Sequence, residues 1–161
     1  MRTSLFTAGA VAIAAALTLA GPAQAAESDA QLSVLHGVPG LTVDVWVNGE
    51  RTLDDFAPGT LAGPLALPAG DYDLAITAAD AADASAPVIG PVKVTLAASG
   101  NYTAVANLDA EGKPTANFFT NDVSQIDAGK GKLTVRHVAA APAVDVLAGG
   151  TPVISGLANP N

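Results

Sequence analysis

The chain carries an internal repeat at a spacing of 101 residues. Residues 31–49 align without a gap with residues 132–150. A fixed period of this kind indicates that one supersecondary unit has been duplicated, and a spacing of about 100 residues is the size of a small β-sandwich. Only the beginning of the second copy falls within the 161 residues. The positions that are identical in the two copies are Leu32 and Leu133, Val34 and Val135, His36 and His137, Val43 and Val144, Asp44 and Asp145, Val45 and Val146, and Gly49 and Gly150.

The first 25 residues have the pattern of a secretory signal peptide. A positively charged start precedes an almost wholly apolar stretch over 5–20, and Ala23–Ala25 forms a cleavage site of the A-x-A type. We expect a helical signal peptide over 1–25, with Ala26 as the first mature residue. A membrane anchor is disfavoured because Gly21 interrupts a run that is too short to cross about 30 Å of hydrocarbon. The prediction is an extracellular protein, secreted or at the cell surface, that does not span the membrane once the leader is removed.

The chain is acidic and contains no cysteine. Its formal net charge is −8 at pH 7, and the leader holds one of the seven basic residues and none of the fifteen acidic ones. Nucleic acid is therefore excluded as a partner, because binding to phosphates needs clustered lysine or arginine. Without cysteines, an exported domain must depend on its apolar core and not on disulfides. Thiol nucleophiles and cysteine-based zinc sites are excluded on the same ground.

Alternating apolar residues between Gly, Pro, Asn and Asp clusters predict an all-β chain. Asn48 and Gly49 are expected to form a type I′ turn, and 79–87 a mobile loop. We expect an immunoglobulin-like antiparallel β-sandwich of about seven strands over 31–127, followed by the start of a second, truncated copy over 128–161. The strands are expected at 31–36, 42–48, 63–67, 72–78, 91–96, 102–108, 115–120, 132–138 and 143–147.

The second copy presents a packing problem, because two strands cannot build a core alone. Either the chain is part of a longer protein, or residues 132–161 dock onto the first module and complete its sheet. We favour the first alternative. In both cases the apolar side chains of the second copy are expected to pack against an apolar surface, such as that of a neighbouring domain copy. These side chains are Leu133, Val135, Val144 and Val146.

In each copy an apolar strand ends in a histidine, His36 or His137, and is followed by a proline-bearing link and by Val-Asp-Val. This pattern resembles the bacterial family catalogued as domain of unknown function 4397. The second copy carries Arg136 near the family's basic position, whereas the first departs from the pattern with Leu35. Two further segments resemble the family, 67–72 (LPAGDY) and 100–103 (GNYT). The resemblance implies one full copy and the start of a second copy of an exported, often tandem domain without an established activity.

The two histidines are equivalent by the repeat. Because each copy offers a single histidine and a stable metal site needs three or four ligands, we expect no metal and no cofactor. Instead, each imidazole is expected to close the end of its strand by donating to a backbone carbonyl or to Asp44 or Asp145. His36 is kept as a candidate for contact with a ligand or partner.

Asp44 and Trp46 are the other two candidates for such contact. A carboxylate inside an apolar strand must be solvated or paired, and the pleat places Asp44 on the outer face, where we expect it to cap a loop. Trp46 lies on the same face. An exposed aromatic ring there would anchor a ligand or a partner, but we favour a ring that covers the sheet under a loop or against the next module.

Nothing in the sequence predicts an enzyme. The chain has no G-x-S-x-G motif, and no pair of carboxylates is singled out. Asp80, Asp83, Asp109 and Glu111 do not fit a calcium-binding loop and are expected to be solvated. We expect a structural or protein-interaction module of the cell envelope or secreted fraction, with an unknown protein or cell-wall partner. The alternative is a carbohydrate- or small-ligand-binding module of the cell envelope that uses the Trp46 face.

Overall fold

The computed structural model describes residues 28–161, so the signal peptide predicted over 1–25 lies outside the described residues. Within 28–161 the chain forms strands and no helix, which confirms the all-β prediction. The strands are β1 (Ala30–His36), β2 (Val43–Val47), β3 (Glu50–Phe56), β4 (Leu61–Leu67), β5 (Gly70–Ala78), β6 (Ile89–Leu96), β7 (Asn101–Leu108), β8 (Pro114–Thr120), β9 (Val144–Ala148) and β10 (Thr151–Leu157).

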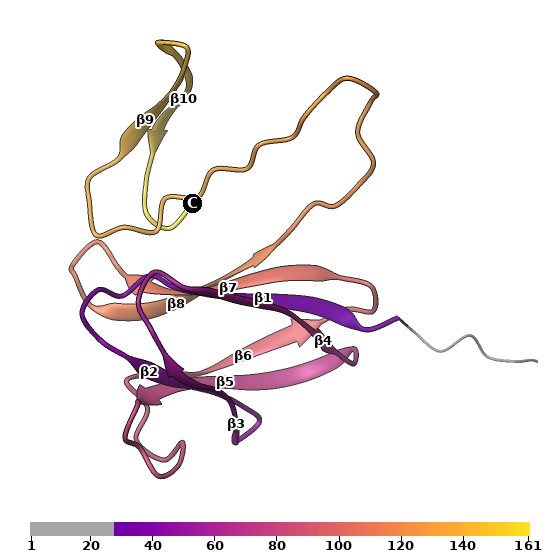
Figure 1. The fold of residues 1–161 in the computed structure, drawn as a ribbon. Helices are drawn as coiled ribbons and strands as arrows, with labels where there is room; N and C mark the ends of the chain where they lie inside the picture. The colour runs from indigo at the N-terminus through magenta and orange to yellow at the C-terminus, as the bar shows by residue number, and fades with distance from the viewer. Residues whose placement is uncertain (1–27) are drawn as a thin grey trace, which may run out of the picture.

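Strands β1 to β8 form two four-stranded sheets that face each other as a sandwich (Figure 1). One sheet has the order β4-β1-β7-β8 and the other has the order β3-β2-β5-β6. Neighbouring strands are antiparallel except for β1 and β7, which are parallel. Strands β9 and β10 form a separate two-stranded sheet, connected to β8 by a long segment that projects from the sandwich (Figure 1).

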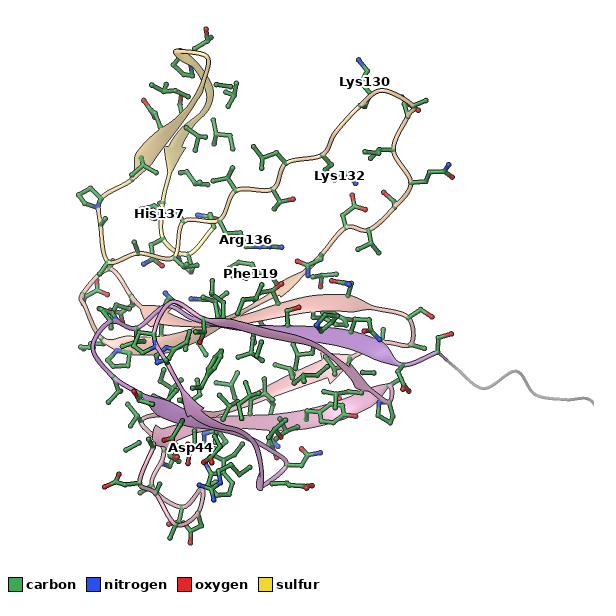
Figure 2. The ribbon with its side chains drawn as sticks, in the orientation of Figure 1. Asp44, Phe119, Lys130, Lys132, Arg136 and His137 are labelled. Carbon is green, nitrogen blue, oxygen red and sulfur yellow. The ribbon has the colours of Figure 1, made fainter. Side chains whose placement is uncertain are left out.

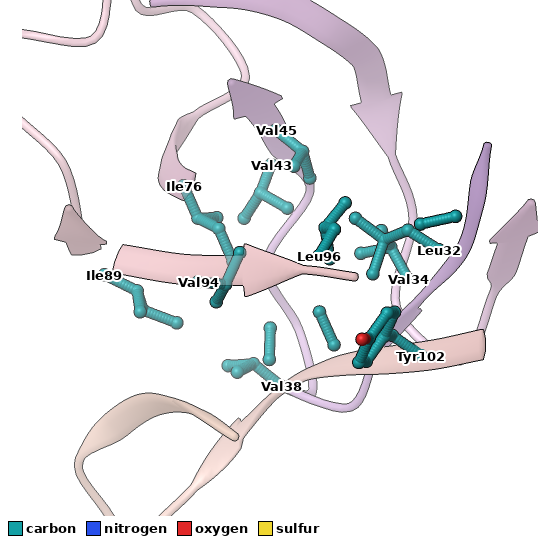
Figure 3. Close-up of a cluster of buried hydrophobic side chains, with 13 residues drawn as sticks. Leu32, Val34, Val38, Val43, Val45, Ile76, Ile89, Val94, Leu96 and Tyr102 are labelled. Atoms are coloured by element: carbon teal, nitrogen blue, oxygen red, sulfur yellow. The ribbon is translucent and has the colours of Figure 1, made fainter. Parts of the chain in front are cut away.

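The core lies between the two sheets (Figure 3). Residues along β1 alternate between buried and half-buried, as expected for a strand with one face on the core. Leu32 and Val34 of β1 belong to the same buried cluster as Val43 and Val45 of the opposite sheet. A small cavity of about 30 Å³ remains in this interior, lined by aliphatic side chains and Thr52. Burial of these apolar side chains is the main force that holds the two layers together.

The predicted strands were largely correct, but β3 was missed. It carries Glu50, Arg51, Asp54 and Asp55 and is mostly exposed, so its sequence has no regular apolar alternation. Charged residues are typical of an edge strand, where they oppose pairing with other chains. The type I′ turn before β3 is confirmed by the positive φ angles of Asn48 and Gly49, 52° and 80°.

The second copy repeats only part of the first. The hairpin of β9 and β10 corresponds to that of β2 and β3, and its turn residues Gly149 and Gly150 also have positive φ angles, 57° and 84°. The strand predicted over 132–138 is wrong, because this segment forms no ladder with another strand. Its counterpart β1 pairs with β4 and β7. Within residues 28–161, the second copy has no strand that corresponds to β4 or β7.

Two of the identical apolar residues are consequently buried in the first copy and exposed in the second. Leu32 is 0 % exposed, whereas Leu133 is 83 % exposed. Val43 is 2 % exposed, whereas Val144 is 40 % exposed. Val135 and Val146 are half-buried. Packing of these four side chains against a neighbouring domain copy stays a prediction. The alternative in which residues 132–161 complete a sheet of the first module is wrong, since β9 and β10 join neither sheet.

Candidate functional site

His36 closes the loop between β1 and β2. Its side chain is buried at the end of β1, and Nε2 lies 2.7 Å from the carbonyl oxygen of Leu41. Because a carbonyl oxygen only accepts, Nε2 carries the proton and donates it. The backbone N–H of Val38 approaches Nδ1 at 3.4 Å, and the ring stacks on Phe56 with 5.7 Å between centroids. Both ring nitrogens are thus engaged by the backbone of the loop.

His137 repeats the carbonyl contact of His36 in the second copy. Its Nε2 lies 3.0 Å from the carbonyl oxygen of Pro142, which is 101 positions after Leu41. The backbone N–H of His36 donates to the carbonyl of Thr60, and that of His137 donates to the carbonyl of Asn161, again 101 positions later. The prediction that each imidazole donates to a backbone carbonyl is confirmed in both copies.

Asp44 caps the backbone of β3. Its Oδ1 accepts a hydrogen bond of 2.9 Å from the N–H of Asp55, and its Oδ2 accepts one of 3.0 Å from Arg51 Nη1. The hydrogen bond with Asp44 and the charge of Asp54 raise the pKa of the Arg51 guanidinium. The predicted capping role is confirmed. Asp44 is fully buried, however, so it is paired and not solvated.

The corresponding aspartate of the second copy repeats this cap. Asp145 Oδ1 accepts a hydrogen bond of 2.8 Å from the N–H of Gly156, which is 101 positions after Asp55. Asp55 and Gly156 both have a positive φ, 49° and 67°. The aspartate therefore holds a left-handed turn of the backbone in both copies. Asp145 differs from Asp44 in that it is exposed.

Trp46 is buried rather than open to solvent. It lies outside the main core cluster, and only 6 % of it is exposed. Its Nε1 donates a hydrogen bond of 2.9 Å to Thr77 Oγ1, and the Arg51 guanidinium lies 5.6 Å from its ring centroid. Figure 2 shows the neighbouring Asp44 on the side of β2 that faces away from the other sheet. The two side chains thus lie on the predicted face, but polar neighbours cover that face.

The second copy contacts the first module through Arg136 (Figure 2). The Arg136 guanidinium lies 4.6 Å from the ring centroid of Phe119 on β8, and its Nη2 donates a hydrogen bond of 2.8 Å to Asn121 Oδ1. Asn121 Nδ2 in turn donates to Asn101 Oδ1 at 2.7 Å and to Thr103 Oγ1 at 2.9 Å. A cation above an aromatic face is attracted by the ring quadrupole. We refer to these five residues as the junction.

A second set of contacts between the copies lies at the other end of β7 from the junction. Asn159 Nδ2 donates to the carbonyl oxygen of Leu108 in the first module at 2.9 Å and to that of Ala139 at 2.7 Å. A hollow of about 340 Å³ lies beside this bridge and is lined by uncharged residues of both copies. The lining residues are Gly37, Pro39, Leu108, Val138, Ala139 and Ala140.

The acidic loops are organised by local backbone contacts. Asp83 Oδ1 accepts the N–H of Ser85, whose side chain also lowers the pKa of this carboxyl group. Asp109 Oδ1 accepts the N–H groups of Glu111 and Lys113. Across residues 28–161, no three His, Cys, Asp or Glu side chains gather closely enough to hold a metal ion. The same residues include no helix long and apolar enough to cross a membrane.

Two arginines that hold these sites together were missed as functional residues from the sequence. Arg51 lies directly across from Trp46 in the β2–β3 register, and the predicted type I′ turn would have placed it there had β3 been recognised. Arg136 was noted for the family pattern alone. Its partners Phe119 and Asn121 lie across a long irregular connection, and no local sequence pattern links them to it.

A comparison with protein-family models finds one match, described as Domain of unknown function (DUF4397), over residues 30–147. The match covers well over half of the chain and continues beyond residue 127 into β9. No curated protein matches the chain.

Proposed function

The chain belongs to the DUF4397 family, and from this premise we propose that it is an exported β-sandwich module with a structural or protein-interaction role. The observation that carries the proposal is the use of the repeated polar residues. In both copies the histidine holds a backbone carbonyl and the aspartate holds a backbone N–H. The side chains best suited to catalysis or metal binding are therefore committed to holding the backbone.

The junction supports an interaction role. Arg136 combines a charged hydrogen bond with an aromatic contact, and arginine with its planar guanidinium is suited to both. The first module offers Phe119 and Asn121 as the matching surface. We propose that consecutive copies of the module dock through this contact, so that the family domain orients its neighbour along the chain.

A ligand-binding role has less support. The alternative function depended on an open Trp46 face, and Trp46 is buried and hydrogen-bonded. The interior cavity of about 30 Å³ is far below the roughly 300–1,000 Å³ of ordinary ligand sites. The hollow of about 340 Å³ reaches that size, but its lining offers no polar side chain to orient a ligand. No observation favours a carbohydrate or small-ligand site over an interaction module.

The export part of the proposal is tested by expressing the full chain and sequencing the N-terminus of the protein recovered outside the cell. We expect Ala26 as the first residue, and a chain that lacks residues 2–25 should stay inside the cell. Recovery of the full chain inside the cell with Met1 or its neighbour intact would contradict export.

The docking part is tested by Arg136→Ala, with Lys130→Ala as the control, because Lys130 also loses one positive charge but is exposed and makes no junction contact. A cation–π contact and a charged hydrogen bond are together worth about 2–4 kcal/mol. Arg136→Ala should therefore let β9 and β10 tumble more independently of the first module, measured by backbone ¹⁵N relaxation. Unchanged relaxation in Arg136→Ala, or an equal change in Lys130→Ala, would contradict docking through the junction.

A further inference from the structure

Residues 121–131 connect the two copies of the repeat. They follow β8, which ends at Thr120, and the second copy of the repeat begins at Lys132. None of them belongs to a strand, and every residue from Asp122 to Lys132 is exposed. The segment projects from the sandwich (Figure 1). The boundary between the copies is thus an exposed stretch of backbone without strand pairing.

An ion pair closes this segment at its base. Asp122 Oδ2 lies 2.5 Å from Lys132 Nζ, and the same ammonium group donates to Ser124 Oγ at 3.2 Å. Asp122 Oδ1 in turn accepts the backbone N–H of Ser124 at 2.9 Å. A surface segment whose ends lie close together forms an Ω-loop. We refer to residues 122–132 as the linker loop.

Lys130 lies at the outer turn of the linker loop. Its backbone N–H donates to the carbonyl oxygen of Asp127 at 3.1 Å, and Gly129 has a φ of 77° within this turn. Figure 2 shows the Lys130 side chain pointing away from the sandwich. Within residues 28–161 its ammonium group makes no ion pair, whereas that of Lys132 is paired with Asp122. Lys130 is thus the lysine of the loop whose side chain is free to enter a binding pocket.

The exposed lysines of the first module are held in ordered backbone. Lys93 lies within β6, opposite Asp73 of β5. Lys113 lies in the hairpin before β8, where its N–H donates to Asp109 Oδ1 at 2.8 Å and its carbonyl oxygen accepts the N–H of Asp109 at 2.9 Å. A protease binds its substrate as an extended strand through main-chain hydrogen bonds, so these sites must first open locally. The turn hydrogen bond at Lys130 is exposed to solvent and opens at little cost.

We propose that the linker loop is a proteolytic modification site, at which an extracellular protease cuts after Lys130. The protease has a carboxylate in its primary specificity pocket, which pairs with the lysine ammonium group. Water adds to the carbonyl carbon of Lys130 and the bond to the Gly131 nitrogen breaks, which leaves a carboxylate on Lys130 and an ammonium group on Gly131. The cut ends the covalent connection between the copies, so their docking becomes concentration-dependent. The inference rests on the proposed export, which places the loop where such a protease acts.

The test treats the purified full chain in native buffer with a low amount of trypsin and follows the products by intact-mass spectrometry. Trypsin carries the required carboxylate in its specificity pocket. The first cut within residues 28–161 should fall after Lys130 and give a fragment that begins at Gly131. Proteolysis of a folded chain follows the population of locally open backbone, so cuts after Lys93 and Lys113 should come later.

Two double variants separate the effect of the loop from the effect of lysine content. Lys130→Gln with Lys132→Gln removes both lysines of the linker loop and should slow the first cut by about tenfold or more, whereas Lys93→Gln with Lys113→Gln should slow it by less than about twofold. Each variant removes two positive charges. All four lysines are exposed, so the fold should tolerate either change.

Three results would overturn the modification site. These are a chain that is not cut first after Lys130, a first cut that the changes at Lys130 and Lys132 do not slow, and equal slowing by the control variant. All three are measured on purified chain, from whichever compartment it is recovered. None of them would alter the export result or the Arg136 result, so failure of the modification site is distinguishable from failure of the proposed function.

Discussion

Replacing Asp44 by alanine should destabilise the first module by about 2–4 kcal/mol. The largest contribution is the hydrogen bond from the Asp55 N–H to a fully buried carboxylate, since hydrogen bonds to charged groups are worth about 1.5–3 kcal/mol. The ion pair with Arg51 adds at most about 1 kcal/mol, because the arginine side chain is 44 % exposed. The same replacement at Asp145 should cost less than about 1 kcal/mol, since water is able to replace this exposed carboxylate at the Gly156 N–H.

Urea unfolding followed by Trp46 fluorescence measures the stability of the first module, because the single tryptophan lies in it. With a urea m-value of about 2 kcal/mol/M, the midpoint for Asp44→Ala should fall by about 1–2 M at an unchanged slope. The midpoint for Asp145→Ala should stay close to that of the parent chain. A cost for Asp44→Ala below about 0.5 kcal/mol, or an equal shift for Asp145→Ala, would refute the assignment of Asp44 as a buried structural cap.

Three further outcomes are expected. Leu32→Ala should cost about 2–5 kcal/mol in urea unfolding, because it empties a fully buried position, whereas Leu133→Ala should stay within about 0.5 kcal/mol since Leu133 is 83 % exposed. Gly63→Ala should cost about 1–3 kcal/mol or more, because Gly63 has a φ of 103° and an added Cβ would lie 2.7 Å from the Leu32 carbonyl oxygen; an unchanged melting temperature would contradict this. A hydrogen bond from Lys132 and smaller contributions from the hydroxyl and N–H of Ser124 hold the pKa of the Asp122 carboxyl group well below its usual range. A carboxyl group whose pKa is lowered by folding stabilises the folded state at pH values above its unfolded-state pKa, and this stabilisation is lost as the pH falls through its folded-state pKa. Lys132→Gln should therefore move the NMR titration of Asp122 to higher pH. An unmoved titration would count against the ion pair.

The sandwich was predictable because its signals are local. The alternation in β1, the Asn48–Gly49 turn and the repeat itself are visible within short windows of the sequence. Pairing partners are not local. The parallel pairing of β1 with β7 joins residues about 70 positions apart, and no periodic pattern specifies it.

The candidate site was predictable in chemistry and less so in environment. The hydrogen bonds of His36 and Asp44 followed from their place at a strand end and inside an apolar strand. A covered Trp46 ring was the favoured interpretation and the ring is buried. The contact with Arg51 was not predicted, because Arg51 lies on a strand whose charged sequence gave no strand signal. Residues 132–138 fail to form the predicted strand for a related reason. Strand propensity is expressed only where partner strands exist.

The tautomer of the two imidazoles gives the most direct test of the claim that the repeated polar residues hold the backbone in both copies. Long-range ¹H–¹⁵N spectra of the full chain at mildly alkaline pH should show His36 and His137 both as the Nε2–H form, since each Nε2 donates to a carbonyl oxygen. Both signals should stay unchanged when zinc is added. An Nδ1–H form at either histidine, or a shift of both rings on addition of zinc, would contradict the structural role assigned to them.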